Sequence, residues 1–194
     1  SNLEDLNITK IPKIIAVSKT FSLDKILPLI EYGHIDYGEN KVQEALDKWT
    51  EIKLKKSNIK LHMIGKLQTN KVKLAVKIFD YIHSVDNEKL AKKISEEQNK
   101  INKKIKIFIQ VNIGDEEQKS GINKNELPNL IIFCKKNNLD IVGLMCIPPK
   151  DIVSEKYFKE MNLLKNEFNF QELSMGMSSD YLNAAKNYST FLRI

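Results

Sequence analysis

The chain has 194 residues, 42% of them hydrophobic and 29% charged, which suits one globular domain with a buried core and argues against a disordered chain. No apolar run reaches the roughly 18 residues that a membrane-spanning helix needs, so no membrane partner is expected. The net charge of +6 comes from lysines spread over the predicted helices, with Arg193 the only arginine. This scatter argues against nucleic-acid binding, which gathers cations on one face.

The first predicted strand, residues 13–19, ends on an unusual residue. Ile14 to Val17 form an apolar run typical of a fully buried strand, and the run leads directly into Ser18 and Lys19. Lysine is rarely buried without a partner. Lys19 therefore either marks the solvent-exposed end of the strand or provides a partly desolvated amine for covalent chemistry.

Strands and helices alternate along the rest of the chain. The later predicted strands are residues 34–39, 60–65, 81–86, 104–113, 141–147, 172–177 and 191–194. The predicted helices are approximately residues 23–32, 40–55, 69–78, 87–98, 123–137, 154–168 and 179–187. This alternation predicts a parallel sheet covered by helices.

Capping residues support several of these helix boundaries. Ser22 is the expected N-cap of the first helix, and Gly33 is the expected residue just beyond its C-terminal end. Asp86 is the expected N-cap of the fourth helix. Asn123 and Glu126 stand three residues apart, as in a capping box, at the start of the fifth.

Eight strands at this regular period indicate a closed (β/α)8 TIM barrel of the α/β class, with residues 1–194 as a single domain. An open doubly wound sheet is the alternative. It is disfavoured because the segment SKTFSLD after the first strand lacks the glycine-rich turn of a dinucleotide-binding fold. In a barrel, functional residues lie at the carboxyl ends of the strands, so the search for a site narrows to those ends.

The strand ends carry a lysine, an asparagine, hydroxyl residues and one arginine. Ser178 and Ser179 are expected to open the last helix after Gly176. Free N–H groups at a helix start can seat a phosphate, although an ordinary serine cap explains these residues equally well. His62 and His83, inside strands, are expected to be structural. No spacing of His, Cys or carboxylates predicts a metal site or a glycosidase pair.

These strand ends together suit one cofactor. An amine on the first strand, a phosphate seat after the seventh and an arginine on the eighth match pyridoxal 5′-phosphate (PLP). PLP has an aldehyde at one end and a phosphate at the other.

Seven segments, in order, carry a resemblance to a known family. They read AVSKT, GENKVQE, HMIGKLQTNK, HSVD, IQVNIGDEEQKSG, GLMCIP and LSMGMSSD, the last followed by YSTFLRI. Together, from residue 13 to the end of the chain, they resemble the PLP homeostasis protein family (YggS/PROSC type), which is similar to the N-terminal barrel domain of alanine racemase. The resemblance implies a PLP-binding barrel of fold-type III.

The resemblance also implies roles for individual residues. Lys19 would form the internal aldimine with PLP, with Asn40 on one side of the cofactor ring and Met175 on the other. Arg193 would face the pyridine nitrogen, where an arginine donates a hydrogen bond and keeps that nitrogen unprotonated. The segment on the phosphate side would contain Ser174, Gly176 and Ser178.

Both ends of the chain depart from the family pattern. Relatives continue past the arginine of the eighth strand with a G-[TS]-x-I-F-G segment that also holds the phosphate. This chain stops at Ile194, so either the eighth unit is truncated or phosphate binding is expected to be weaker. The helix that precedes the first strand in relatives is expected to be short or absent.

The implied function is to hold, buffer or deliver PLP in the cytoplasm, with PLP-dependent apo-enzymes as candidate recipients and a monomer as the expected state. Cys134 and Cys146 lie in apolar segments and are expected to be reduced. Racemisation needs a second acid/base group, and an open single-domain barrel does not exclude water. A PLP-dependent amino-acid racemase-like enzyme and a cofactor-free aldolase-type barrel are the alternatives, and Lys119 is a candidate second amine.

Overall fold

The computed structural model describes residues 3, 6, 8, 10–117, 120–149 and 153–194. Eight parallel strands follow one another in sequence order, and the last pairs with the first to close a barrel. They are β1 (Lys13–Val17), β2 (Asp36–Glu39), β3 (Lys60–Met63), β4 (Tyr81–Val85), β5 (Lys106–Gln110), β6 (Asp140–Met145), β7 (Glu172–Met177) and β8 (Phe191–Arg193). The predicted (β/α)8 barrel is confirmed.

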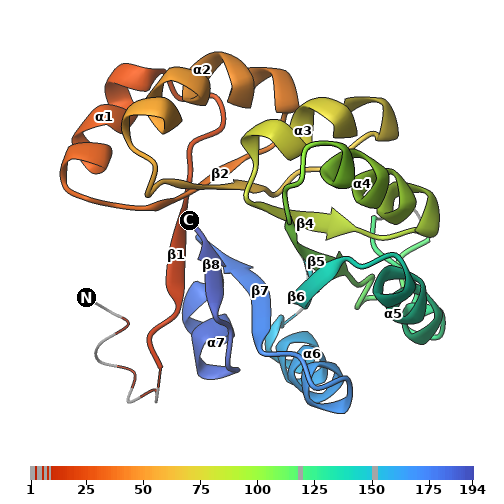
Figure 1. The fold of residues 1–194 in the computed structure, drawn as a ribbon. Coiled ribbons are helices and arrows are strands. Elements are labelled where there is room, and N and C mark those ends of the chain that lie inside the picture. Colours follow the sequence, from red (N-terminus) through yellow and green to blue (C-terminus); the bar gives the residue numbers. More distant parts are fainter. Residues whose placement is uncertain (1–2, 4–5, 7, 9, 118–119, 150–152) are drawn as a thin grey trace.

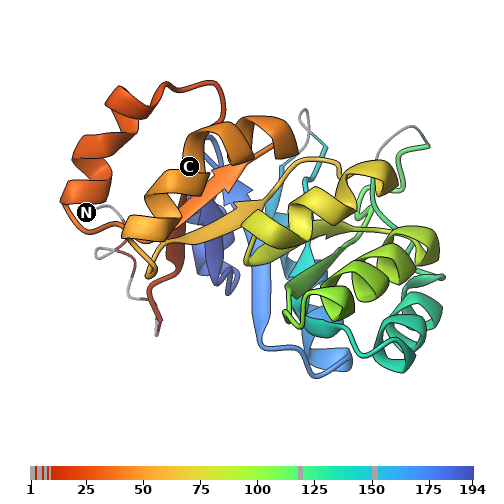
Figure 2. The same ribbon diagram turned by 45° about the horizontal axis from the view of Figure 1, so that its top comes forward.

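Helices surround these strands (Figure 1). They are α1 (Leu23–Glu31), α2 (Val42–Lys55), the 3-10 turn η1 (Thr69–Lys71), α3 (Val72–Ile78), α4 (Glu88–Lys100), α5 (Leu127–Lys136), α6 (Glu155–Glu167) and α7 (Tyr181–Lys186). Neighbouring helices lie side by side, with α2 against α3 and α3 against α4 (Figure 2). Within the described residues, no helix is both long enough and apolar enough to cross a bilayer.

Two hydrophobic clusters form the core. The larger fills the layer between the barrel and the helices. The smaller fills the barrel interior and contains Ile15, Tyr81, Phe108, Met145 and Phe191. Because side chains alternate along a strand, strands such as β4, β5 and β6 contribute residues to both clusters. At the amino end of the barrel, the first residues of β1 and β5 place lysine ammonium groups 5.4 Å from the rings of Phe191 and Tyr81.

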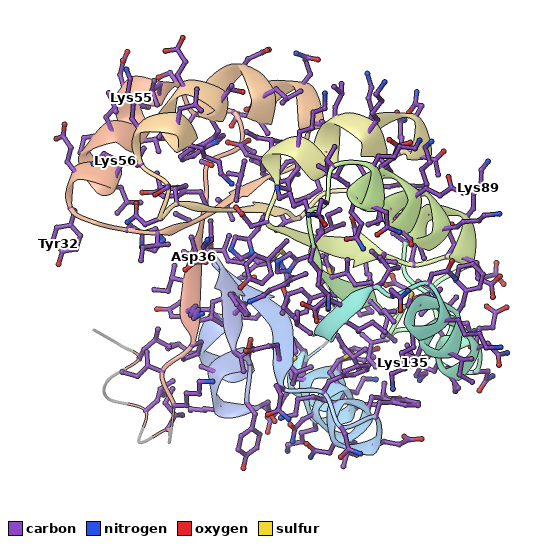
Figure 3. All side chains as sticks on the ribbon, viewed as in Figure 1. Tyr32, Asp36, Lys55, Lys56, Lys89 and Lys135 are labelled. Atoms are coloured by element: carbon purple, nitrogen blue, oxygen red, sulfur yellow. The ribbon has the colours of Figure 1, made fainter. Side chains whose placement is uncertain are left out.

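Several of the scattered lysines lie on the outer faces of the helices. Figure 3 shows Lys55, Lys89 and Lys135 at the periphery, pointing away from the barrel, whereas Asp36 lies among the strands. The positive charge is therefore distributed around the molecule, as the sequence pattern predicts.

The fourth helix begins one residue later than the sequence indicates. Asn87 is the N-cap of α4, and its side-chain oxygen accepts the Leu90 N–H at 2.8 Å. The Asp86 carboxylate accepts from the Asn87 amide group and from the Gly121 N–H instead. Asp86 therefore ties the β4 end to a neighbouring loop, and the prediction that it caps the helix is wrong.

The predicted capping box of the fifth helix is also wrong. The side chain of Asn123 accepts the N–H of Asn125 at 3.0 Å, so it closes a local turn. Glu126 stands at the N-cap position without a side-chain cap, and α5 begins at Leu127. The side chain of Asn123 bonds to the N–H two residues ahead rather than to the one three residues ahead that a capping box requires.

The first helix follows its predicted ends more closely. Ser22 occupies the N-cap position, although its side chain makes no capping hydrogen bond. Gly33 follows the C-cap with φ +98°, in the left-handed region that glycine adopts without steric cost.

Candidate functional site

Lys19 and Arg193 lie at the carboxyl mouth of the barrel, at the ends of β1 and β8. Ile15 and Phe191 belong to the interior cluster. Because side chains alternate along a strand, Arg193, two residues after Phe191 on β8, faces the same interior, whereas Lys19 lies in the turn two residues beyond the end of β1. Lys19 is exposed just beyond the end of β1, whereas Arg193 is buried at the end of β8.

Asn40 lies just beyond the end of β2, the strand that pairs with β1. Val17 pairs with Gly38, and the Ser18 N–H continues the ladder by donating to the Gly38 carbonyl. Lys19 and Asn40 follow this paired segment, just beyond the ends of β1 and β2. The half-buried Asn40 is packed closely from behind, because a Cβ at Gly65 would come within 2.6 Å of its carbonyl oxygen.

The backbone around Lys19 is held on both sides. The hydroxyl of Ser18 donates to Glu39 Oε1 at 2.8 Å. Thr20, with φ 65°, donates its N–H to Glu44 Oε1 at 2.7 Å. Burial alone would raise the pKa of Glu44, but this N–H and Lys48 lower it below its usual range, so the carboxylate stays charged. These contacts fix the peptide that carries Lys19 before any ligand binds.

A buried ion pair lies behind this peptide. Glu39 Oε1 accepts hydrogen bonds from Lys48 Nζ at 2.8 Å and from Trp49 Nε1 at 2.9 Å, in addition to Ser18. Lys48 also donates to the Ser18 carbonyl at 2.8 Å. The side chains of Glu39 and Lys48 are 0% and 9% exposed, so each charge depends on the other.

Arg193 is held in a fixed plane. Its guanidinium donates from Nη1 to Ser174 Oγ at 2.7 Å and from Nη2 to the Cys146 carbonyl at 2.9 Å, and the residue is 4% exposed. Burial lowers the pKa of the guanidinium below its ordinary value, but arginine remains a donor only.

A chain of hydrogen bonds runs from Arg193 across the barrel interior. Ser174 Oγ lies 2.8 Å from His83 Nδ1, and His83 Nε2 lies 2.9 Å from His62 Nδ1. His62 Nε2 lies 2.8 Å from Asp36 Oδ1. We call this series the barrel chain. It links the first residue of β2 to the last residue of β8, so the two histidines are fully satisfied structural residues, as the sequence predicts.

Burial keeps both histidines neutral. It lowers the pKa of His62, although Asp36 opposes the effect. It lowers the pKa of His83 well below the ordinary value, with His62 and Arg193 acting in the same direction. The charged groups that face His62 are Asp36, Asp80 and Lys13.

This burial predicts that stability falls as the pH drops from about 7 to about 5.5. The unfolded histidines gain a proton near pH ~6.5 while the folded ones do not, so the free energy of unfolding decreases with falling pH. The slope is up to about 1.4 kcal/mol per pH unit for each histidine. Urea unfolding across this range measures it. A flat profile would contradict it.

The seventh strand and its following turn differ from the predicted site. Met175 is fully buried in the layer between barrel and helices, so its side chain does not face the mouth. The Ser174 hydroxyl is engaged inside the barrel. Gly176 has φ +97°, and a Cβ there would lie 2.5 Å from Ala184, so glycine permits close packing of β7 on α7. Ser178 is exposed near the mouth.

The last helix begins later than expected. Asp180 is the N-cap position of α7, which starts at Tyr181, so Ser178 and Ser179 lie in the preceding turn. Asp180 accepts the Met177 N–H at 2.7 Å. The prediction that the two serines open the helix is wrong, because Asp180 closes the turn locally. The second candidate amine, Lys119, lies outside the described residues.

The comparisons with known proteins agree with this geometry. The family model for the N-terminal domain of alanine racemase matches residues 2–194. An alanine racemase of Clostridium difficile 630 shares the fold, with a TM-score of 0.74 at 15% identity over 99% of this chain and 52% of that chain. Fold and mouth together define a barrel of the alanine racemase N-terminal class.

More similar relatives narrow this class. The pyridoxal phosphate homeostasis protein of Pasteurella multocida (strain Pm70) is 35% identical over 193 residues, covering 94% of this chain and 83% of the relative. PipY of Synechococcus elongatus PCC7942 matches with a TM-score of 0.87 without PLP, at 31% identity, and 0.81 with PLP bound, at 32%. Each match covers 94% of this chain and 89% of PipY. The chain belongs to the pyridoxal phosphate homeostasis protein family.

Proposed function

We propose that this chain binds PLP at the carboxyl mouth of the barrel and takes part in PLP (vitamin B6) homeostasis. The observation that carries the proposal is that Lys19, Asn40 and Arg193 all lie at the carboxyl ends of neighbouring strands, at one mouth of the barrel. The names of the relatives and the PLP-bound structure of PipY support it.

The donor groups at the mouth fit the cofactor. The exposed amine of Lys19 is the group that attaches to the aldehyde carbon, and its peptide is already fixed by neighbouring hydrogen bonds. Asn40 would flank the ring, and Arg193 would donate to the ring nitrogen. The exposed turn at Ser178 is the phosphate side. When bound, PLP supplies an electron sink, which is weaker when the ring nitrogen carries no proton.

We propose holding and delivery of PLP rather than sustained catalysis. Two carboxylates, Glu39 and Asp86, stand at the described strand ends, and both are engaged in structural hydrogen bonds. Neither is free to act as the second acid/base that racemisation requires. The proposed recipients are PLP-dependent apo-enzymes. The proposed oligomeric state is a monomer. The proposed location is the cytoplasm, where the two buried cysteines would stay reduced.

Titration with PLP, followed by incubation with L-alanine, tests this function. We expect a visible absorbance band from the lysine-bound cofactor and no sustained appearance of D-alanine. Turnover of many equivalents of L-alanine would overturn the homeostasis proposal in favour of a racemase. A protein that stays colourless at saturating PLP would overturn PLP binding itself.

A further inference from the structure

With Asp36 as an acceptor and both histidine rings neutral, the hydrogens of the barrel chain have one consistent direction. Arginine has donors only, and an ionised carboxylate has acceptors only. Starting from Asp36, the neutral ring of His62 must carry its proton on Nε2, which leaves Nδ1 as an acceptor. His83 must therefore donate from Nε2 and accept at Nδ1. The Ser174 hydroxyl therefore donates to His83 Nδ1, and Ser174 Oγ accepts from Arg193 Nη1.

We propose that the barrel chain positions Arg193 and strengthens its hold on the ligand at the mouth, acting from a carboxylate at the opposite end of the barrel. Its positioning residues are Asp36, His62, His83 and Ser174. The proposal rests on the proposed function for the identity of the ligand, because Arg193 is the group that meets the PLP ring nitrogen. The chain itself is present without any ligand.

Packing around the chain restricts each link. The ring of His62 stacks on Tyr81 at 4.3 Å, and the ring of His83 stacks on Phe108 at the same separation. Phe191 packs against both histidines. A flip of either ring would break its hydrogen bonds and disturb this packed layer. In such a low-dielectric interior, successive hydrogen bonds also polarise and strengthen one another.

The consequence for Arg193 is a guanidinium with little freedom. Ser174 Oγ can accept from Nη1 in the observed geometry while its own proton is committed to His83. The Cys146 carbonyl holds Nη2. A ligand then meets donors that are already oriented, so binding loses less side-chain entropy.

Nuclear magnetic resonance of the unliganded protein tests the chain directly. In protein labelled with 15N, we expect His62 and His83 to be neutral with the proton on Nε2 from about pH 8 to about pH 6. Arg193 is the only arginine, so its guanidinium signals identify themselves. We expect separate Nη1 and Nη2 signals. A proton on Nδ1 of either histidine would overturn the proposed direction.

Two variants of His62 test whether the chain acts on Arg193. His62 is three hydrogen bonds away from Arg193 and does not contact the ligand. His62→Leu interrupts the chain, so we expect the Nη signals to merge and PLP binding to weaken about tenfold, the effect of one hydrogen bond to a charged group. His62→Gln keeps an acceptor for His83 and a donor for Asp36, so we expect an affinity within about twofold of the wild type.

Matched measurements separate this role from general stability. Ser95→Ala removes a buried hydroxyl that donates to the Asn137 carbonyl outside the barrel, and it should leave PLP affinity unchanged. If His62→Leu does not fold, Ser174→Ala cuts the chain with a smaller change and carries the same expectation. Unchanged Nη signals and affinity in a folded interrupted variant would overturn the proposal. If the wild type does not bind PLP, the proposed function fails. The Nη signals of the His62→Leu variant would still show whether the barrel chain positions Arg193.

Discussion

Replacing Lys48 by methionine is expected to destabilise the protein by about 3–5 kcal/mol, the usual cost of removing one partner of a buried ion pair. Glu39 would remain fully buried with its charge uncompensated. The carbonyl of Ser18 would also lose its donor, so the peptide before Lys19 would loosen. Urea denaturation monitored by circular dichroism measures the change in the free energy of unfolding.

Lys159→Met is the matched control for this substitution. Lys159 pairs with Glu155 on α6, where the two side chains are 64% and 49% exposed. Solvent screens such a pair, so its loss should leave the denaturation midpoint almost unchanged. If Lys48→Met were as mild as this control, the pair with Glu39 would not be the support of the β1 end that its burial indicates.

Replacing Lys19 by alanine is expected to abolish the visible absorbance that PLP gives with the wild-type protein, while the fold is preserved. The side chain is exposed and contributes no core volume, so the far-UV spectrum and the denaturation midpoint should not change. The lost signal would reflect the loss of the amine that lies just beyond the carboxyl end of β1.

Lys55→Ala provides the control for Lys19→Ala. Lys55 is also an exposed lysine, but it lies at the end of α2 on the periphery of the molecule (Figure 3). This variant should keep the full absorbance. A normal band in Lys19→Ala would assign the covalent attachment to another lysine, and a collapsed far-UV spectrum would assign Lys19 a structural role instead.

Local signals predict the barrel and the position of Lys19 well. The strand–helix period is written in short stretches of sequence, and a lysine after a buried apolar run marks a strand end whatever lies beside it. Helix starts are less predictable, because side chains such as Asn123 and Asp86 can form hydrogen bonds with several nearby groups. The Asn125 N–H competes for Asn123 at short range and wins.

The buried residues that hold the site in place are harder to predict from the sequence. Glu39 and Lys48 are nine residues apart on different elements, and only the packing of α2 on β2 brings them together. His62 and His83 lie on neighbouring strands, and each occupies the third position of its strand. That shared position was a signal that they could meet, but Ser174 joins them from across the barrel, which only the closed topology places there.

The most direct test of PLP binding at Lys19 is reduction of the PLP-treated wild-type protein with borohydride, followed by peptide mapping. Reduction makes the bond between lysine and cofactor permanent, so the modified residue can be identified by mass spectrometry. We predict one stoichiometric modification, at Lys19. The absence of a modified peptide, or a modification at lysines other than Lys19, would contradict the assignment of the barrel mouth as the PLP site.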